Sequence, residues 1–168
     1  MREKIKNLWN IVKPYILPYS VAIAIPLTVG IISAALTKDS MDIYEKFNTP
    51  QLSPPAILFP IVWTLLYILM GVSSAMIYMD REKNPDAAKK GLIWYSASLV
   101  LNFSWSIIFF NLEAAFAALL VLAVLLYTII RTIIEYRRVK PIAAYLQIPY
   151  ALWVAFAGYL NAGIWLLN

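Results

Sequence analysis

The sequence contains neither cysteine nor histidine. Their absence excludes disulfides and removes the thiolate and imidazole ligands that zinc sites and most haem irons require, so we expect no metal site. It also removes histidine, the most frequent general base of enzymes. Conventional protease and metalloenzyme chemistry is therefore not expected, and no cofactor is required.

Acidic residues are scarce and avoid the apolar parts of the chain. There are only nine Asp and Glu residues among 168, and all of them lie outside the long apolar stretches or at their ends. Intramembrane carboxylates and histidines are the usual parts of proton relays and ion-coupled transporters. An ion-coupled pump, or a channel with a charged filter, is therefore not expected either.

Apolar residues, in contrast, dominate the composition. They make up 62% of the chain, and the mean hydropathy is +0.71, whereas soluble domains are about 45–50% apolar. A helix that spans a bilayer needs about 20 apolar residues. We therefore predict an all-α polytopic membrane protein, a single domain over residues 1–168 that forms a bundle of five transmembrane helices. The predicted spans are residues 15–37, 56–79, 91–111, 114–134 and 142–167.

The first span has some features of a signal peptide, because basic residues precede it and the small residues Ser33, Ala34 and Ala35 lie near its end. Its apolar run is longer than the 7–15 residues of an ordinary signal-peptide core. We therefore expect the segment to be retained as a membrane span.

Basic residues gather on one side of the predicted bundle. The segment before the first span, the loop between the second and third, and the segment from Arg131 to Lys140 at the end of the fourth span hold twelve of the 14 basic residues. Lys38 and Lys46 alone lie on the other side. The positive-inside rule then places the N-terminus in the cytoplasm and the C-terminus outside, in the cytoplasmic membrane of a prokaryote. The net charge of +5 thus reflects topology and contact with the lipid bilayer, and nucleic acid is not an expected partner.

Aromatic residues recur at helical spacing inside three spans. Each of these faces combines a large aromatic side chain with a small or hydrogen-bonding one, which suits a pocket for a flat, mostly apolar ligand. Packing between helices explains such stripes equally well, and the asparagines either join neighbouring helices or line a cavity. The three faces are Trp63, Tyr67 and Gly71; Asn102, Trp105 and Phe109; and Tyr150, Trp153, Ala157 and Asn161.

Prolines lie where they would shape a cavity and its entrance. Prolines at positions 26, 60 and 149 fall within spans, where proline removes a backbone donor and kinks or breaks a helix. The loop before the second span contains Pro50, Leu52, Pro54 and Pro55. We interpret this proline-stiffened loop as a lid.

The segment from Pro50 to Gly71, PQLSPPAILFPIVWTLLYILMG, resembles the TspO/MBR family, the tryptophan-rich sensory proteins and translocator proteins or peripheral benzodiazepine receptors. Two further blocks agree, LNFSWSIIFF at 101–110 and PYALWVAFAGYLN at 149–161, so the resemblance covers about residues 15–168. It implies a bundle of five helices, often a homodimer, that binds porphyrins and other hydrophobic ligands in a cavity beneath the first loop.

The resemblance also assigns residues. Trp63 and Trp153 match the two pocket tryptophans that are implicated in porphyrin chemistry in the family, and these two are the catalytic candidates if there is any catalysis. Leu52 stands where the family often has tryptophan, and the C-terminus GIWLLN lacks the cholesterol-recognition pattern of animal members. The resemblance further places Asn102, Trp105, Tyr150 and Ala157 at positions that line or border the family cavity. We add Tyr67 to these ligand-binding candidates, because it shares a helix face with Trp63.

Three functions remain open at this stage. The preferred one is a receptor-like protein that binds a porphyrin, another tetrapyrrole or a similar flat hydrophobe, for sensing, transport or stress regulation. Without histidine or cysteine, a metal-free porphyrin is a better ligand than haem. The second is a light-dependent porphyrin-degrading enzyme with Trp63 and Trp153 as redox-active side chains. The third is a ligand-free membrane interaction protein, in which Gly71 and Ala75 support contacts between helices.

Overall fold

The computed structural model describes residues 2–38 and 47–168, and the side chains from Val12 onward. Over these ranges the chain is helical apart from turns, and five of its segments are long and apolar enough to cross a membrane. The prediction of an all-α bundle with five membrane spans is confirmed. The elements are α1 (Arg2–Thr37), α3 (Leu58–Met79), the 3-10 turn η2 (Arg81–Lys83), α4 (Pro85–Ser106), the π-helix η3 (Ile107–Asn111), α5 (Ala115–Arg137), α6 (Pro141–Tyr145) and α7 (Ile148–Leu167).

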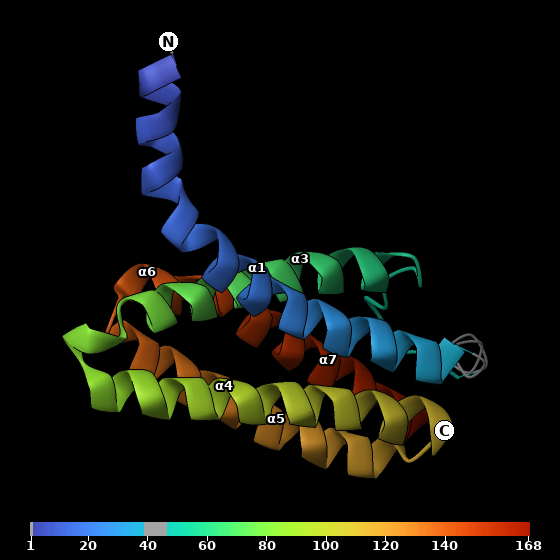
Figure 1. Ribbon diagram of the computed structural model, residues 1–168. Coiled ribbons are helices and arrows are strands. Elements are labelled where there is room, and N and C mark those ends of the chain that lie inside the picture. Colours follow the sequence, from blue (N-terminus) through green and yellow to red (C-terminus); the bar gives the residue numbers. More distant parts are fainter. Residues whose placement is uncertain (1, 39–46) are drawn as a thin grey trace.

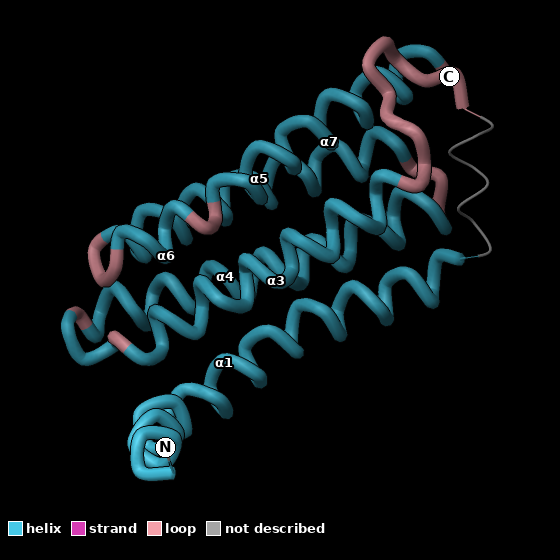
Figure 2. Tube along the Cα trace, turned by 90° about the horizontal axis from the view of Figure 1, so that it is seen from above, coloured by secondary structure: helices cyan, strands magenta, loops and turns pink. Residues whose placement is uncertain are grey.

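The helices run beside one another in an elongated bundle (Figures 1 and 2). The main packing partners are α4 with α5, α5 with α7, and α1 with α3. Figure 2 shows α1 at the edge of the bundle. Only 17% of the residues in its most apolar window are buried, against 33–44% for the other four spans. The first span is therefore the least buried of the five.

Helix α1 carries three prolines, at positions 14, 18 and 26. In Figure 1 its N-terminal turns leave the bundle at an angle to the rest of the helix. Proline removes a backbone hydrogen bond and is the usual cause of such a bend. The basic N-terminal segment is thus directed away from the bundle axis.

Three helices extend beyond the apolar spans that define them in the sequence. Helix α1 begins at Arg2 rather than at residue 15. Helix α4 begins at Pro85 rather than near residue 91, because the Asn84 side chain accepts a hydrogen bond from the Ala87 amide at 3.2 Å and proline fits the first turn. Helix α5 continues to Arg137, so Arg131 and Glu135 are helical rather than part of a loop. Apolar length marks the part of a helix inside the bilayer, whereas the backbone hydrogen bonds continue into the polar region.

The basic end of the bundle is held by an ionic contact between two turns. The carboxylate of Asp80 lies 2.9 Å from Lys83 Nζ in the α3–α4 turn and 3.1 Å from Lys140 Nζ in the α5–α6 turn. Hydrogen bonds from Lys83 and Lys140 hold the pKa of Asp80 below its usual value. The two basic turns predicted to share one side of the membrane are therefore in contact.

At the opposite end, the described segment before α3 is hydrogen-bonded to the C-terminal residue and to α7. The Asn48 amide donates to Asn168 Oδ1 at 3.0 Å, and Asn168 Nδ2 donates back to the Asn48 carbonyl at 3.1 Å. The Tyr159 hydroxyl donates to the Gln51 carbonyl at 2.7 Å. Lys46, predicted to face this side, lies outside the described residues.

Close contact between α1 and α3 depends on Gly71. A Cβ atom at this position would lie 2.5 Å from Ile23 Cα and 2.8 Å from the Ala22 carbonyl oxygen. Both are backbone atoms, which cannot turn aside as a flexible side chain can. Gly71 thus lets α1 approach α3 closely, as small residues do in membrane helix pairs, and the buried Ala75 follows one turn later on the same helix.

Gly71→Ala is therefore expected to force α1 away from α3. Overpacking of this kind costs about 1–3 kcal/mol, so the midpoint of thermal unfolding of the detergent-purified protein should fall. Gly158→Ala is the matched control, because a Cβ there meets no atom within 4 Å. Equal midpoints for the two variants would show that the helices are not this closely packed.

Candidate functional site

A cavity of about 330 Å³ lies between α1, α3 and the junction of α4 with η3. This volume is at the lower end of the roughly 300–1,000 Å³ that is usual for ligand pockets. Three of its walls come from different helices, so it exists only in the folded bundle. Its aromatic lining is Phe59, Trp63, Tyr67, Trp105 and Phe110, and α1 supplies Leu27, Gly30, Ile31, Ser33, Ala34 and Thr37.

Three aromatic rings form a continuous wall on one side of the cavity. Trp63 and Tyr67, one turn apart on α3, are stacked with centroids 5.5 Å apart, and Trp105 from α4 lies 6.4 Å from Trp63. Tyr67 and Trp105 are buried, whereas Trp63 is only half-buried. The Trp63 indole is therefore the ring of this group that is most available to a ligand.

The opposite wall is formed by α1, with Leu27 and Ile31 beside four smaller residues. A Cβ atom on Gly30 would lie 2.3 Å from Cε2 of Tyr67, so that ring packs directly on the α1 backbone. The polar side chains at the cavity are partly engaged within their own helices, because Thr37 donates to the Ser33 carbonyl and Thr64 to the Pro60 carbonyl. The cavity thus offers mainly aromatic and aliphatic surface.

A hydrogen-bonded network behind the aromatic wall fixes the orientation of Tyr67. The Tyr67 hydroxyl donates to Asn102 Oδ1 at 3.0 Å, and Asn102 Nδ2 donates to the Tyr150 hydroxyl at 3.3 Å. All three side chains are buried. The network joins α3, α4 and α7 in the middle of the bundle, where an unpaired polar group would be unfavourable.

A second asparagine orients Trp105 in the same way. The indole Nε1 of Trp105 donates to Asn161 Oδ1 at 3.2 Å, and Asn161 Nδ2 donates to the Ala115 carbonyl at 2.7 Å. Asn102 and Asn161 therefore both join neighbouring helices, one of the two roles that the sequence left open. They also position two aromatic rings of the cavity from behind.

The π-helix η3 follows Trp105 after one residue and redirects the aromatic side chains beyond it. Trp105 stacks on Phe109 with centroids 5.6 Å apart, while Phe110 turns to line the cavity. Single π-turns inside α-helices occur frequently at functional sites. Here the π-turn brings the end of the third span against the cavity.

The predicted ligand-binding residues come together but lie in two layers. Trp63, Tyr67 and Trp105 line the cavity, and Asn102 lies behind them. Tyr150 meets Trp63 edge to face at 6.2 Å, and Trp153 meets Phe59 edge to face at 5.9 Å. Ala157 borders a separate void of only about 20 Å³. The ligand-binding role of all seven stays a prediction.

Sequence reasoning missed Phe59, Phe110 and the contribution of α1. Phe59 was recognisable, because it precedes Trp63 by four residues and so shares its face of α3. Phe110 was hidden by the change of helical pitch in η3. The α1 residues carry no aromatic signal, and only packing against α3 brings them to the cavity.

The loop that we interpret as a lid is packed against α7 at Pro50 and lies outside the cavity wall at all four proposed residues. Pro50 packs on Gly163, where an added Cβ would lie 2.5 Å from its ring. Leu52 is 81% exposed and has a φ angle of 71°, in the left-handed region that non-glycine residues seldom adopt. Neither these two residues nor Pro54 and Pro55 belong to the cavity lining. Their role as a lid stays a prediction.

Asn102→Leu should destabilise the bundle, because it leaves the buried hydroxyls of Tyr67 and Tyr150 without this partner. We expect a loss of about 1–2 kcal/mol in the free energy of unfolding. Tyr67→Phe should lower the free energy of unfolding by less. The loss in the double variant Tyr67→Phe/Asn102→Leu should be smaller than the sum of the two single losses, since both substitutions remove the same hydrogen bond. Additive losses in chemical unfolding would mean that Tyr67 and Asn102 do not interact.

Comparison with known proteins finds relatives that match most of the chain. The chain is 34% identical over 154 residues to the tryptophan-rich protein TspO of Chlorobaculum tepidum, covering 91% of this chain and 97% of the relative. It is 30% identical over 152 residues to the tryptophan-rich sensory protein of Cereibacter sphaeroides, covering 90% of each. It is 31% identical over 142 residues to the translocator protein of Bos taurus, covering 84% of each.

The family assignment follows from these matches and from a separate match to the family as a whole. Residues 22–166 match the TspO/MBR family, a range that includes all three sequence blocks and every lining residue of the cavity. The chain therefore belongs to the TspO/MBR family.

Proposed function

We propose that this protein is a membrane receptor that binds a porphyrin, or a similar flat hydrophobic molecule, in the cavity between α1, α3 and α4. The observation that carries the proposal is the convergence of Trp63, Tyr67 and Trp105 on one apolar cavity. Three aromatic rings from two helices offer stacking surface, and the exposed part of Trp63 is the first contact for an entering ligand.

The chemistry of the lining favours a ligand held by stacking. The chain has no histidine or cysteine, the usual ligands of a haem iron, so a metal-free porphyrin suits it better than haem. The hydroxyls of Thr37 and Thr64 donate to backbone carbonyls of their own helices. Selectivity would then rest on shape and on aromatic contact rather than on charge.

A role in sensing or transport is in keeping with the names of the relatives, which include a sensory protein and translocator proteins. The contact between the basic turns at Asp80 and Lys140 supports an orientation with that end and the N-terminus in the cytoplasm. The C-terminus would then lie outside, in a prokaryotic cytoplasmic membrane. We further propose, from the family resemblance, that the protein forms a homodimer.

Light-dependent porphyrin degradation is the second candidate. Trp63 in the cavity wall is placed to exchange an electron with a bound porphyrin. Trp153 lies behind Phe59, with ring centroids 5.9 Å apart, and would act as a relay rather than touch the ligand. A ligand-free interaction protein is favoured less, because pure packing would not leave Trp63 half-buried beside a cavity.

Binding can be tested by titrating the detergent-purified protein with protoporphyrin IX in the dark and following tryptophan fluorescence. We expect saturable quenching, and a dissociation constant about tenfold higher for Trp63→Phe, equivalent to about 1.4 kcal/mol. Trp165→Phe is the matched control, because Trp165 packs on Phe116 and does not line the cavity.

An unchanged dissociation constant in Trp63→Phe would place the porphyrin elsewhere, and an absence of saturable quenching would reject porphyrin as the ligand. Illumination of the saturated complex then separates the two candidate functions. Loss of porphyrin absorbance that requires the protein, and that slows in Trp63→Phe/Trp153→Phe, would favour the enzyme over the receptor.

A further inference from the structure

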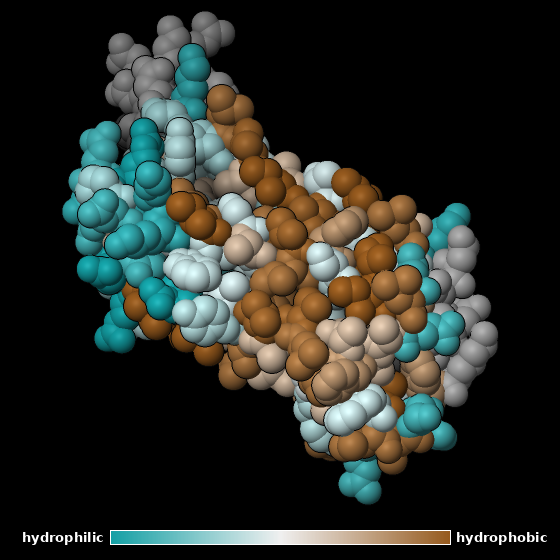
Figure 3. Space-filling model, turned by 90° about the horizontal axis from the view of Figure 1, so that it is seen from below, coloured by the Kyte–Doolittle hydropathy of each residue, from teal (hydrophilic) through white to brown (hydrophobic). Residues whose placement is uncertain are grey.

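Arg131 is a charged residue inside the fourth span. It lies in α5, about 9 Å before the helix ends at Arg137, at 1.5 Å per residue. Its neighbours on the outward side, Tyr127, Ile130 and Ile134, are about half exposed, and in a membrane-spanning bundle such apolar side chains face lipid. Figure 3 shows the apolar band giving way to polar residues toward one end of the molecule. The guanidinium thus lies near the border between hydrocarbon and headgroups.

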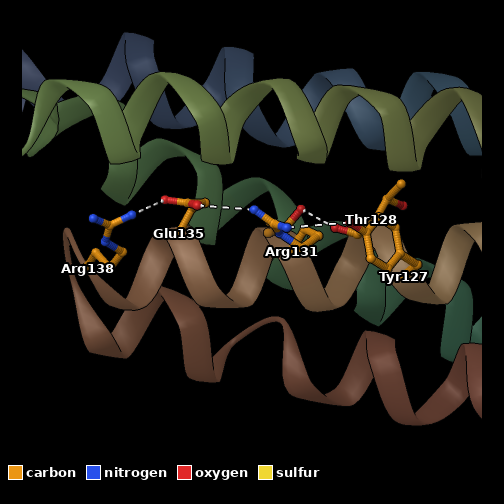
Figure 4. A network of polar contacts seen from close by, with 6 residues as sticks. Tyr127, Thr128, Arg131, Glu135 and Arg138 are labelled. Carbon is orange, nitrogen blue, oxygen red and sulfur yellow. Dashed lines mark hydrogen bonds and ion pairs between the residues drawn. The ribbon is translucent and has the colours of Figure 1, made fainter.

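The hydrogen bonding of Arg131 is incomplete (Figure 4). An arginine has five N–H donors. Nη1 has only a long bond of 3.5 Å to the Tyr127 hydroxyl, and Nη2 lies 3.7 Å from Glu135 Oε1. Nε is buried and has no hydrogen-bond partner among the described residues. Donors in proteins are nearly always paired. Nε is shielded from the outside, so the incompletely paired donors that a further acceptor could reach are those of Nη1 and Nη2.

Glu135 does not supply that acceptor, because it is engaged more closely on its other side. Arg138 Nη1 donates to Glu135 Oε2 at 3.1 Å, which is shorter than the contact with Arg131. The Glu135 carboxylate, 5% exposed, thus stands between two arginines, and the three side chains carry a formal charge of +1. The Arg131 side chain is 38% exposed, so the excess charge is open to an anion from outside the bundle.

Two aromatic side chains hold the guanidinium between α4 and α5. The Cζ atom of Arg131 lies 5.4 Å from the ring of Trp94, and Trp94 meets Tyr127 edge to face at 5.8 Å. Tryptophan and tyrosine are enriched at the level of lipid headgroups, and cation–π contact positions a guanidinium without neutralising it. The remaining donors are left for an anion that reaches this depth.

We propose that the surface between α4 and α5 binds one phospholipid through its phosphate, with Arg131 as the main ligand. Guanidinium groups bind phosphate oxygens in pairs, and basic sites between helices at this side of membranes bind lipid headgroups. The excess positive charge favours an anionic lipid over a zwitterionic one. Acyl chains would lie along Ile130 and Ile134. The site is separate from the aromatic cavity, to which α5 contributes no residue.

Lipid binding to the detergent-purified protein can be measured by native mass spectrometry with added phosphatidylglycerol or phosphatidylcholine. We expect one tightly retained phosphatidylglycerol, weaker retention of phosphatidylcholine, and a loss of phosphatidylglycerol affinity of about fivefold or more in Arg131→Gln. Arg137→Gln is the matched control, because Arg137 is exposed at the end of the same helix and should retain the lipid.

Several results would overturn the proposal. The first is that Arg131→Gln and the unchanged protein retain phosphatidylglycerol equally. The second is that Arg137→Gln loses as much affinity for phosphatidylglycerol as Arg131→Gln does. The third is that inorganic phosphate displaces the lipid when it is added at the same concentration. The second would mean general attraction to the basic end, and the third a site for free anions. Arg131→Lys covers the case in which Arg131→Gln does not fold. It keeps the charge but not the paired donors, so its retention should be intermediate, and full retention would contradict the assigned geometry.

Discussion

Two asparagine side chains in the middle of the bundle hold the candidate site in place. Inside a bilayer an amide group has no water to bond, so Asn102 and Asn161 must find partners on other helices. The partners that they find include Tyr67 and Trp105, two of the three rings that form the aromatic wall. The requirement for hydrogen bonding thus stabilises the bundle and orients the surface that a ligand would meet.

The other side of the cavity is held very differently. Helix α1 carries no comparable polar link to the middle of the bundle among the described residues. It rests on α3 through Gly71 and against the ring of Tyr67 through Gly30. Contacts of this kind depend on close fit and are lost when the helices separate slightly. The cavity therefore lies between a wall oriented by hydrogen bonds and a wall held mainly by close packing.

Charged side chains at the basic end of the bundle also find partners on neighbouring segments. The charged groups at the basic end are linked where they meet, as in the contacts of Asp80 with Lys83 and Lys140. Arg131 is paired less completely than these groups, since its closest carboxylate is bound more tightly by Arg138. A charge that the protein leaves incompletely paired at headgroup depth is one that lipid can complete. The aromatic cavity and the lipid site would then use different helices and different chemistry.

The sequence by itself determined the class of the protein. Apolar runs set the number of helices and the basic residues marked one end, because both properties depend only on the order of residues along the chain. Helical spacing also grouped Trp63 with Tyr67, and the resemblance singled out Trp105. Tertiary structure decided which of these rings line a cavity. Trp153 lies behind Phe59, and α1 supplies the opposite wall, because these relations depend on how neighbouring helices dock. Spacing within one helix describes its own faces but not which helix each face will meet.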